Sequence, residues 1–386
     1  MKRVAIISGF GWAGVSVPVA MTIEYLVSNG YFVDIYFERD QICEGLGLNQ
    51  PFFEYENSQV IYFEEYHDDL FNNKNEYGIW LSQKDSAFVS FISQRGVGYD
   101  WVIGFEPHGV IRAGLYALEN QIDYIYFSLE FNEKEDYLQI AEKFFAKKAQ
   151  VILTQDPYRA KILADLLDIP LEKIHGVFNT TIGNVIESKS NYLREVFNIS
   201  KEKIIVLAIG SLLKITGVDK ILDSLSDWDQ EYVLVLHGWT MDDYIRGKID
   251  EALIKHPGCF YYSGEVLPHA KKFDIFSSAD IGLIYYAPVN LNLKYAAWSS
   301  GKFYDFARCG VPVIANAIPN MRKLVEDNMC GIVLDDFKSF PSVFHNIRDR
   351  YSHYRKYCYE TFKKYDFESS FGEGIKSVEG EKNADN

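Results

Sequence analysis

The sequence lacks the long apolar segments that carry proteins to or across membranes. None of its 386 residues belong to a run of about 18 or more uncharged apolar residues, which excludes a transmembrane helix. The N-terminus passes from Met1-Lys2-Arg3 directly into Val4-Ala5-Ile6-Ile7, without the apolar core or small-residue cleavage site of a secretory signal peptide. We therefore expect a cytoplasmic protein.

Cysteine is sparse, and its distribution excludes two structural roles. The five cysteines are odd in number, lie far apart and form no CxxC pair. Neither a disulfide framework nor a zinc site is therefore predicted. No other cluster of metal-ligating residue types stands out, so we predict no metal, and we expect the cysteines to be buried, reduced thiols.

Positive charge is also scarce. Lysine and arginine total 39 against 54 aspartates and glutamates, so the formal net charge is −15. This is the wrong sign for a protein whose main partner is a polyphosphate backbone, which excludes nucleic acid. A local basic and aromatic patch at residues 143–148 is our candidate for peripheral contact with a membrane, and the alternative there is an amphipathic helix packed on a sheet.

The sequence does contain two series of short β-branched runs that alternate with helix-like segments. This alternation predicts an α/β fold in two halves, each with a parallel sheet covered by helices on both faces. The predicted strands are 4–8, 32–37, 100–104, 123–128 and 151–154 in the first half, and 203–209, 232–236, 259–262, 281–285, 311–315 and 331–334 in the second. Residues 40–95 are expected to be loops with a few short elements. A ligand is expected between the halves, at the carboxyl ends of both sheets.

The linker between the halves is predicted at 178–190, which carries Asn, Thr, Gly and Ser without periodicity. We accordingly assign residues 1–180 to an N-terminal domain and 181–350 to a C-terminal domain. Residues 351–372 are expected to form a C-terminal helix that packs back on the N-terminal domain, and 373–386 a disordered tail.

The first predicted strand is followed by a G-x-G-x-x-G pattern from Gly9 to Gly14, before a helix. The glycines allow a tight turn, the helix N-terminus favours an anion, and Glu38 at the end of the next strand could accept from a ribose hydroxyl. This predicts nucleotide contacts at Gly11 and Gly14 and leaves open an NAD(P)-dependent oxidoreductase. The alternative is that the glycines only allow the helix to pack on the sheet.

A more specific pattern runs from Ser299 to Ala315, reading SSGKFYDFARCGVPVIA. Ser300 and Gly301 form a small-residue turn before a short predicted helix that presents Lys302 in its first turn and Asp305 one turn later. A helix N-terminus with a lysine suits a phosphate, and the carboxylate suits a ribose diol. The alternative is a solvated helix face on which the two charges form an i,i+3 pair.

In this pattern the sequence resembles the donor-binding region of retaining glycosyltransferases of the GT-B, twin-Rossmann architecture, of the family 4-like (group 1) kind. Further segments that resemble this family are 209–219, 237–238, 263–264, 278–283, 99–106 and 124–130. The resemblance implies two Rossmann-like domains whose parallel sheets face across a cleft, the first binding the acceptor and the second a nucleotide diphosphate sugar. It implies transfer of a hexose-type sugar to a glycan or lipid-linked acceptor with retention, as in polysaccharide biosynthesis. Neither a metal nor a cofactor beyond the donor is implied.

Individual roles follow from the resemblance and from position. Asp305 takes the place of the glutamate that holds the donor ribose, while Lys302 and Lys214 would stabilise the leaving diphosphate. Glu106 and His108 follow a predicted strand, so they are expected at the carboxyl edge of the first sheet, near a sugar. The predicted site comprises the catalytic residues Lys302, Lys214, Glu106 and His108 and the donor-binding residues Gly11, Gly14, Gly210, Ser211, Ser300, Gly301, Asp305 and Asn292.

The sequence also departs from the family pattern. Ala297 stands where the first of two paired glutamates is usual, and Ser211 and Thr216 stand where the family carries a basic pair that neutralises the diphosphate. These departures motivate a further alternative, a non-catalytic glycosyltransferase-like protein that binds or scaffolds a partner.

Overall fold

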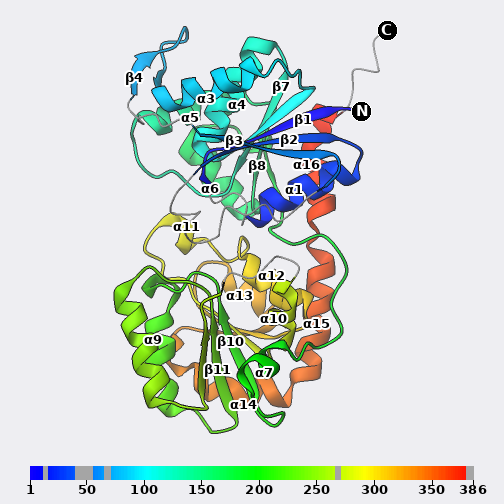
Figure 1. The fold of residues 1–386 in the computed structure, drawn as a ribbon. Coiled ribbons are helices and arrows are strands. Elements are labelled where there is room, and N and C mark those ends of the chain that lie inside the picture. Colours follow the sequence, from blue (N-terminus) through cyan, green and yellow to red (C-terminus); the bar gives the residue numbers. More distant parts are fainter. Residues whose placement is uncertain (12–15, 40–54, 65–70, 266–270, 380–386) are drawn as a thin grey trace. The chain divides into compact units, whose positions relative to one another are not determined.

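The computed structural model describes residues 1–11, 16–39, 55–64, 71–265 and 271–379. The chain divides into two compact units, which are described separately (Figure 1). Unit 1 comprises Met1–Ile182 together with Phe367–Asn386, and unit 2 comprises Gly183–Asp366.

Unit 1 is built on a parallel sheet with the strand order β3-β2-β1-β6-β7-β8-β9. Its strands are β1 (Arg3–Ser8), β2 (Phe32–Glu38), β3 (Ser58–Phe63), β6 (Trp101–Phe105), β7 (Asp123–Ser128), β8 (Val151–Thr154) and β9 (Ile174–Gly176). The central strands are nearly continuous apolar runs because helices bury both of their faces. A separate antiparallel hairpin joins β4 (Phe71–Lys74) to β5 (Trp80–Ser82).

Helices cover both faces of this sheet (Figure 1). One face carries α1 (Val17–Ser28) and α16 (Phe367–Glu379), and the other carries α3 (Gln83–Gln94), α4 (Glu106–Asn120) and α5 (Tyr137–Lys148), while α6 (Pro157–Leu167) connects β8 to β9. In α16, Phe367, Phe371 and Ile375 are fully buried in the same apolar cluster as β1 and α1. The last helix therefore completes the core of the unit in which the chain begins.

Unit 2 has a second parallel sheet, with the order β12-β11-β10-β13-β14-β15. Its strands are β10 (Ile204–Ile209), β11 (Tyr232–His237), β12 (Phe260–Ser263), β13 (Ile281–Ile284), β14 (Val313–Asn316) and β15 (Gly331–Leu334). Its helices are α7 (Tyr192–Phe197), α8 (Val218–Asp223), α9 (Asp243–Lys255), α10 (Lys272–Ser278), α11 (Leu291–Lys294), α12 (Gly301–Arg308), α13 (Met321–Val325), α14 (Phe344–Asp349) and α15 (Tyr351–Lys364). Short 3₁₀ turns include η3 (Lys214–Thr216) and η6 (Phe337–Val343).

The predicted fold class is confirmed, and the predicted strands agree with the observed ones to within one or two residues. Two details were wrong. The described part of the stretch 40–95 contains the short strands β3, β4 and β5, which agree with the few short elements expected there, but it also contains the 12-residue helix α3, which was not expected. The chain after 350 forms two helices rather than one: α15 belongs to unit 2, whereas α16 belongs to unit 1 and continues to Glu379, so residues 373–379 are helical because their apolar side meets the core. Residues 380–386 lie outside the described part of the chain.

Both sheets reverse their strand order at one place, and this locates the edge where a ligand is expected. In unit 1 the reversal lies between β1 and β6, and in unit 2 between β10 and β13. Open parallel sheets bind ligands beyond the carboxyl ends of the strands at such switch points. The turns after β1 and β6, and those after β10 and β13, are therefore the candidate sites.

Candidate functional site

The turn after β10 brings backbone, rather than side chains, to the switch point of unit 2. Gly210 and Gly238, at the ends of β10 and β11, have φ angles of 111° and 146°. A side chain at Gly238 would overlap the carbonyl of Gly210. Ala287 N donates to Ile215 O (2.9 Å), which ties this turn to the loop after β13. Glycine is thus needed where the two strand ends meet.

Lys302 brings a positive charge to this turn. It is the second residue of α12, and a Cβ built on Gly210 would lie 3.5 Å from its Nζ. Its ammonium lies 5.4 Å from the centre of the Tyr286 ring, and no carboxylate of the described residues forms an ion pair with it. Burial lowers the pKa of Lys302 to about 8. A positive charge held in this way favours an anionic ligand.

Tyr286 and Asn316 hold the entrance of α12 in place. Asn316, the last residue of β14, accepts from Tyr286 N and donates its side-chain amide to Tyr286 O, each at 2.9 Å. The Tyr286 hydroxyl lies 2.8 Å from Ser300 Oγ, and Ser300 is the N-cap of α12, before Gly301. The sequence analysis missed both residues, although Tyr286 lies two residues after β13 and Asn316 ends β14, and these strand-end positions could have identified them.

Asp305 is paired with a residue that the sequence analysis did not consider. Its Oδ2 lies 2.6 Å from Nζ of Lys272, at the start of α10, and the Asp305 side chain is almost fully buried. Burial raises the pKa of Asp305, and Lys272 opposes this shift. The i,i+3 pair between Lys302 and Asp305, the alternative interpretation of this helix, is absent from the described ion pairs, because the two side chains contact different groups.

The other predicted residues of unit 2 lie around the same edge. Lys214 belongs to η3, and its ammonium lies 5.8 Å from the ring centre of Tyr244. Thr216 donates to the carbonyl of Ser211 (2.9 Å) and accepts from Leu213 N (3.0 Å), so its hydroxyl shapes the turn. Asn292 lies in the short helix α11, after β13.

In unit 1, Glu106 occupies a strained position at the switch point. It is the first residue of α4 and has φ = 67°, in the left-handed region that favours glycine. Its Oε1 accepts from Leu129 N (2.6 Å) and Glu130 N (3.0 Å), beyond the end of β7. Burial, together with the Glu130 carboxylate, raises the pKa of Glu106 to about 8. The side chain thus connects two neighbouring strand ends.

His108 lies two residues further along α4 and is oriented by a buried carboxylate. Its Nδ1 is 3.0 Å from both oxygens of Asp85 on α3. Asp85 is fully buried, and it also accepts from Arg112 Nε (2.6 Å) and from the Ser82 hydroxyl (2.8 Å). Arg112 and His108 hold the pKa of Asp85 well below its usual range, against the effect of burial. Asp85 lies in the stretch 40–95, for which mainly loops were predicted, so this pair could not be predicted from the sequence.

The glycine-rich pattern after β1 serves packing at its first position. A Cβ on Gly9 would come within 2.8 Å of Gly109 N and 2.9 Å of His108 Cβ, and Gly9 N donates to Phe105 O (3.1 Å). Gly11 lies in the turn that follows, and Gly14 lies outside the described residues. Of the two interpretations of the glycine-rich pattern, close packing of a helix therefore explains Gly9.

Glu38, the residue expected to bind a dinucleotide ribose, is engaged elsewhere. It forms ion pairs with Arg112 and with Lys84 (2.6 Å). These two cations hold Glu38 in the network that also contains Asp85, so the structure gives no support to the oxidoreductase alternative.

The basic segment 143–148 lies on α5. Phe145 and Ala146 are buried, and Lys143 and Lys147 both face Asp168, at 3.9 and 2.8 Å. Within the described ranges, no helix is long and apolar enough to cross a membrane. Nor do those ranges contain a group of three or more His, Cys, Asp or Glu residues placed to hold a metal ion.

Comparison with solved structures identifies the fold. HepE of Anabaena, solved with UDP and glucose, is similar with a TM-score of 0.71 and 12% identity, over 98% of this chain and 100% of HepE. Sucrose-phosphate synthase from Thermosynechococcus elongatus matches with a TM-score of 0.68 and 14% identity, over 97% of this chain and 98% of the synthase. The catalytic domain of starch synthase IV from Arabidopsis thaliana, solved with ADP and acarbose, matches with a TM-score of 0.65 and 13% identity, over 98% of this chain and 100% of that domain.

These similarities show that the chain has the GT-B fold, which is a fold of glycosyltransferases. No protein-family model matches the chain, and no curated protein matches it.

Proposed function

We propose that the protein is a glycosyltransferase of the family 4-like kind, which transfers a sugar from a nucleotide diphosphate donor to a glycan or lipid-linked acceptor with retention. In this proposal unit 2 binds the donor and unit 1 the acceptor. HepE was solved with UDP and starch synthase IV with ADP, which supports a nucleoside diphosphate as the leaving group. No cofactor other than the donor is proposed.

The observation that carries the proposal is Lys302 at the switch point of unit 2. Departure of a sugar leaves negative charge on the diphosphate, and a cation that is already in place stabilises it without reorganisation. Lys302 lacks a carboxylate partner among the described residues, and it lies beside the half-buried backbone of Gly210. The turn from Ser300 to Gly301 would present the N–H groups of α12 to the same diphosphate.

The remaining residues of unit 2 have supporting roles in the proposal. Lys214 adds positive charge to the turn after β10. Asn292 would contact the donor sugar or diphosphate, and Asp305 would bind the ribose with its carboxylate oriented by Lys272.

In unit 1 the proposal assigns the sugar contact to His108 and Glu106. Asp85 acts as a positioning residue, since it accepts from Nδ1 of His108 and thereby directs Nε2 away from the buried network. Below a pH of about 8, Glu106 carries a proton and can donate a hydrogen bond.

A thermal-shift titration with UDP, ADP, GDP and their sugar conjugates tests the proposal, because a ligand that binds the folded state raises its melting temperature. We expect stabilisation by one nucleoside diphosphate and an affinity roughly 10- to 100-fold weaker in Lys302→Met, the effect of losing a hydrogen bond to a charged group. Lys338→Met, at an exposed lysine of the same unit, is the matched control. Equal affinity in the Lys302 and Lys338 variants would count decisively against the assignment.

One observation favours a second candidate, a protein that binds a nucleotide sugar without turnover. The Thr216 hydroxyl is used within its own turn, and neither it nor Ser211 replaces the charge usual in the family. A coupled assay that measures the slow release of UDP by hydrolysis of a bound UDP-sugar distinguishes the two candidates, since only the transferase should release UDP. Any hydrolysis above that of Lys302→Met excludes the non-catalytic one.

Peripheral membrane contact through 143–148 stays a prediction. Co-sedimentation with anionic vesicles tests it, and charge reversal at Lys148, whose ammonium lies over the rings of Tyr77 and Phe144, is the informative variant.

A further inference from the structure

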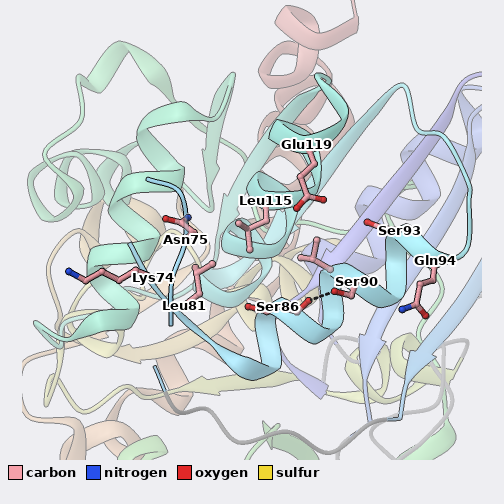
Figure 2. A pocket seen from close by; sticks show the side chains of 10 residues that line it. Lys74, Asn75, Leu81, Ser86, Ser90, Ser93, Gln94, Leu115 and Glu119 are labelled. Atoms are coloured by element: carbon pink, nitrogen blue, oxygen red, sulfur yellow. Dashed lines mark hydrogen bonds between the residues drawn. The ribbon is translucent and has the colours of Figure 1, made fainter. Parts of the chain in front are cut away.

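Unit 1 contains a pocket that the proposed reaction does not use. It has a volume of about 500 Å³ and lies between the β4–β5 hairpin, α3 and α4 (Figure 2). This volume falls within the roughly 300–1,000 Å³ of small-molecule sites. Its lining residues are Lys74, Asn75, Leu81, Ser86, Val89, Ser90, Ser93, Gln94, Leu115 and Glu119.

The lining combines an apolar floor with many small polar groups. Leu81 and Val89 are buried, and Leu115 is partly buried beside them. Around this floor, serine hydroxyls and an amide come from α3, as Figure 2 shows for Ser90 and Gln94. Such a surface matches a sugar ring, which has apolar C–H faces and a rim of hydroxyl groups.

The hydrogen-bonding state of the serines supports the same chemistry. Ser86 Oγ donates to Ser82 O (3.1 Å), and Ser90 Oγ donates to Ser86 O (2.9 Å). Each hydroxyl therefore uses its one proton within the helix and keeps lone pairs that can accept from a ligand hydroxyl. Ligands that offer donors, as polyols do, fit this row.

The charges of the pocket favour a neutral, polar ligand. Lys74 and Glu119 are its two charged residues, so the lining is neutral overall. An anion would meet the Glu119 carboxylate, and an apolar ligand would bury the polar row without partners. A neutral saccharide can donate to the Glu119 carboxylate, whereas the Lys74 ammonium lies 5.1 Å from the centre of the Trp80 ring.

The pocket and the His108–Asp85 pair are built on the same two helices, α3 and α4. Ser86 directly follows Asp85 on α3, while Leu115 and Glu119 lie 7 and 11 residues after His108 on α4. At 1.5 Å per helical residue these positions are roughly 10 and 16 Å from His108 along the axis. A chain of a few sugars could therefore reach from the pocket toward His108.

We propose that this pocket is a binding subsite for a neutral glycan, holding a sugar unit of an acceptor remote from the one that reacts. The role as an acceptor subsite rests on the proposed function, but the binding itself does not.

A glycan microarray tests the binding without any nucleotide. The full-length protein is applied to neutral oligosaccharides of glucose, galactose, mannose and N-acetylglucosamine, two to six units long, together with sialylated and sulfated glycans. Ser90→Trp fills the pocket from an exposed position on α3, and Ser352→Trp, at an exposed serine of α15, is the matched control. We expect binding to neutral glycans that falls at least tenfold in Ser90→Trp and is retained in Ser352→Trp.

Three outcomes would overturn the proposal: binding that Ser90→Trp does not weaken, preference for anionic glycans, or no glycan binding at all. If nucleotide-sugar turnover is present while glycan binding is absent, the subsite fails and the transferase assignment survives. If transfer to both short and long acceptors is found, Ser90→Trp should raise the KM for the long acceptor alone, with kcat and the donor KM unchanged. Equal KM changes for short and long acceptors would also overturn it.

Discussion

At the scale of single residues, the site depends on charges whose partners are few and well defined. Lys302 contacts an aromatic ring and a glycine turn, whereas Asp305, one turn later on α12, is neutralised by Lys272. Two charges that are neighbours in the sequence therefore differ in what they can offer a ligand. Lys302 retains a charge that a phosphate can compensate, so the affinity for a nucleotide should depend on pH.

Nucleotide binding should take up a proton at alkaline pH. In the free protein the pKa of Lys302 is lowered to about 8, and a bound diphosphate should raise it because an adjacent anion favours the ammonium form. Below pH 7 the amine is already charged, so affinity should be constant. Above pH 8 it should weaken by up to about tenfold per pH unit. Calorimetric titration of UDP or ADP at pH 7 and 9, in two buffers of different ionisation enthalpy, measures this uptake, and Lys302→Met should show none.

The pair formed by His108 and Asp85 shows what sequence reasoning could not reach at this scale. His108 was identified from its place after a strand, because strand ends of a parallel sheet gather at one edge. Asp85 precedes it by 23 residues in a helix whose surroundings carry no clear period, so nothing in the sequence indicated that the two meet. Tyr286 and Asn316 could have been found from their strand-end positions, whereas the ion pair of Lys272 required the packing of α10 on α12.

At the scale of elements, the start of α4 is where the sheet edge and the helix meet. Its first residue, Glu106, adopts a left-handed conformation and accepts two N–H groups from the segment after β7. The raised pKa of this carboxyl makes the junction sensitive to pH.

The stability of the folded chain should fall as pH rises from about 4.5 to about 8. In this window the folded protein retains the Glu106 proton that the unfolded chain has lost. For each such proton, the free energy of unfolding falls by about 1.4 kcal/mol per pH unit. Glu142, with its pKa raised to about 7, acts in the same direction. Glu106→Gln, whose amide oxygen can accept the same two N–H groups, should flatten the slope. Urea unfolding at pH 5 to 8 measures this slope of stability against pH. Glu119→Gln, on the same helix, is the control and should leave the slope unchanged. Equal slopes would contradict the assigned pKa.

Strand positions were predictable because continuous apolar runs of four to six residues bounded by glycine or polar residues have few alternatives to a buried parallel strand. The β4–β5 hairpin and α3 could not be placed for the converse reason. They lie on the surface of unit 1, and their polar faces interrupt the apolar pattern. The pocket of Figure 2 is formed by these two elements and α4, so the sequence could not indicate it.

At the scale of the whole molecule, the path of the chain links the two units twice. The chain leaves unit 1 after Ile182 and returns to it at Phe367. In α16, the Phe371 ring lies 5.1 Å from that of Tyr25 on α1, and His175 Nε2 lies 2.9 Å from Ser370 O. Unit 1 thus depends on a helix that follows all of unit 2.

Phe371→Ala should destabilise unit 1 by about 3–5 kcal/mol, the usual cost of removing a buried phenylalanine ring. Hydrogen exchange followed by mass spectrometry should then show faster exchange in β1, β7 and α1, while peptides of β10 to β15 keep their protection. Phe344→Ala, in the buried core of unit 2, is the matched control and should produce the opposite pattern. Loss of protection throughout both units in either variant would contradict this independence.

The return of α16 also sets an order of events during synthesis. A ribosome releases the strands of unit 1 first, yet the three apolar side chains that close their core, Phe367, Phe371 and Ile375, emerge only after the last strand of unit 2. The sheet and helices of unit 2 are contiguous in the chain. Unit 2 can therefore complete its core while the core of unit 1 still lacks α16. The first part of the chain to be translated is therefore the last to be finished.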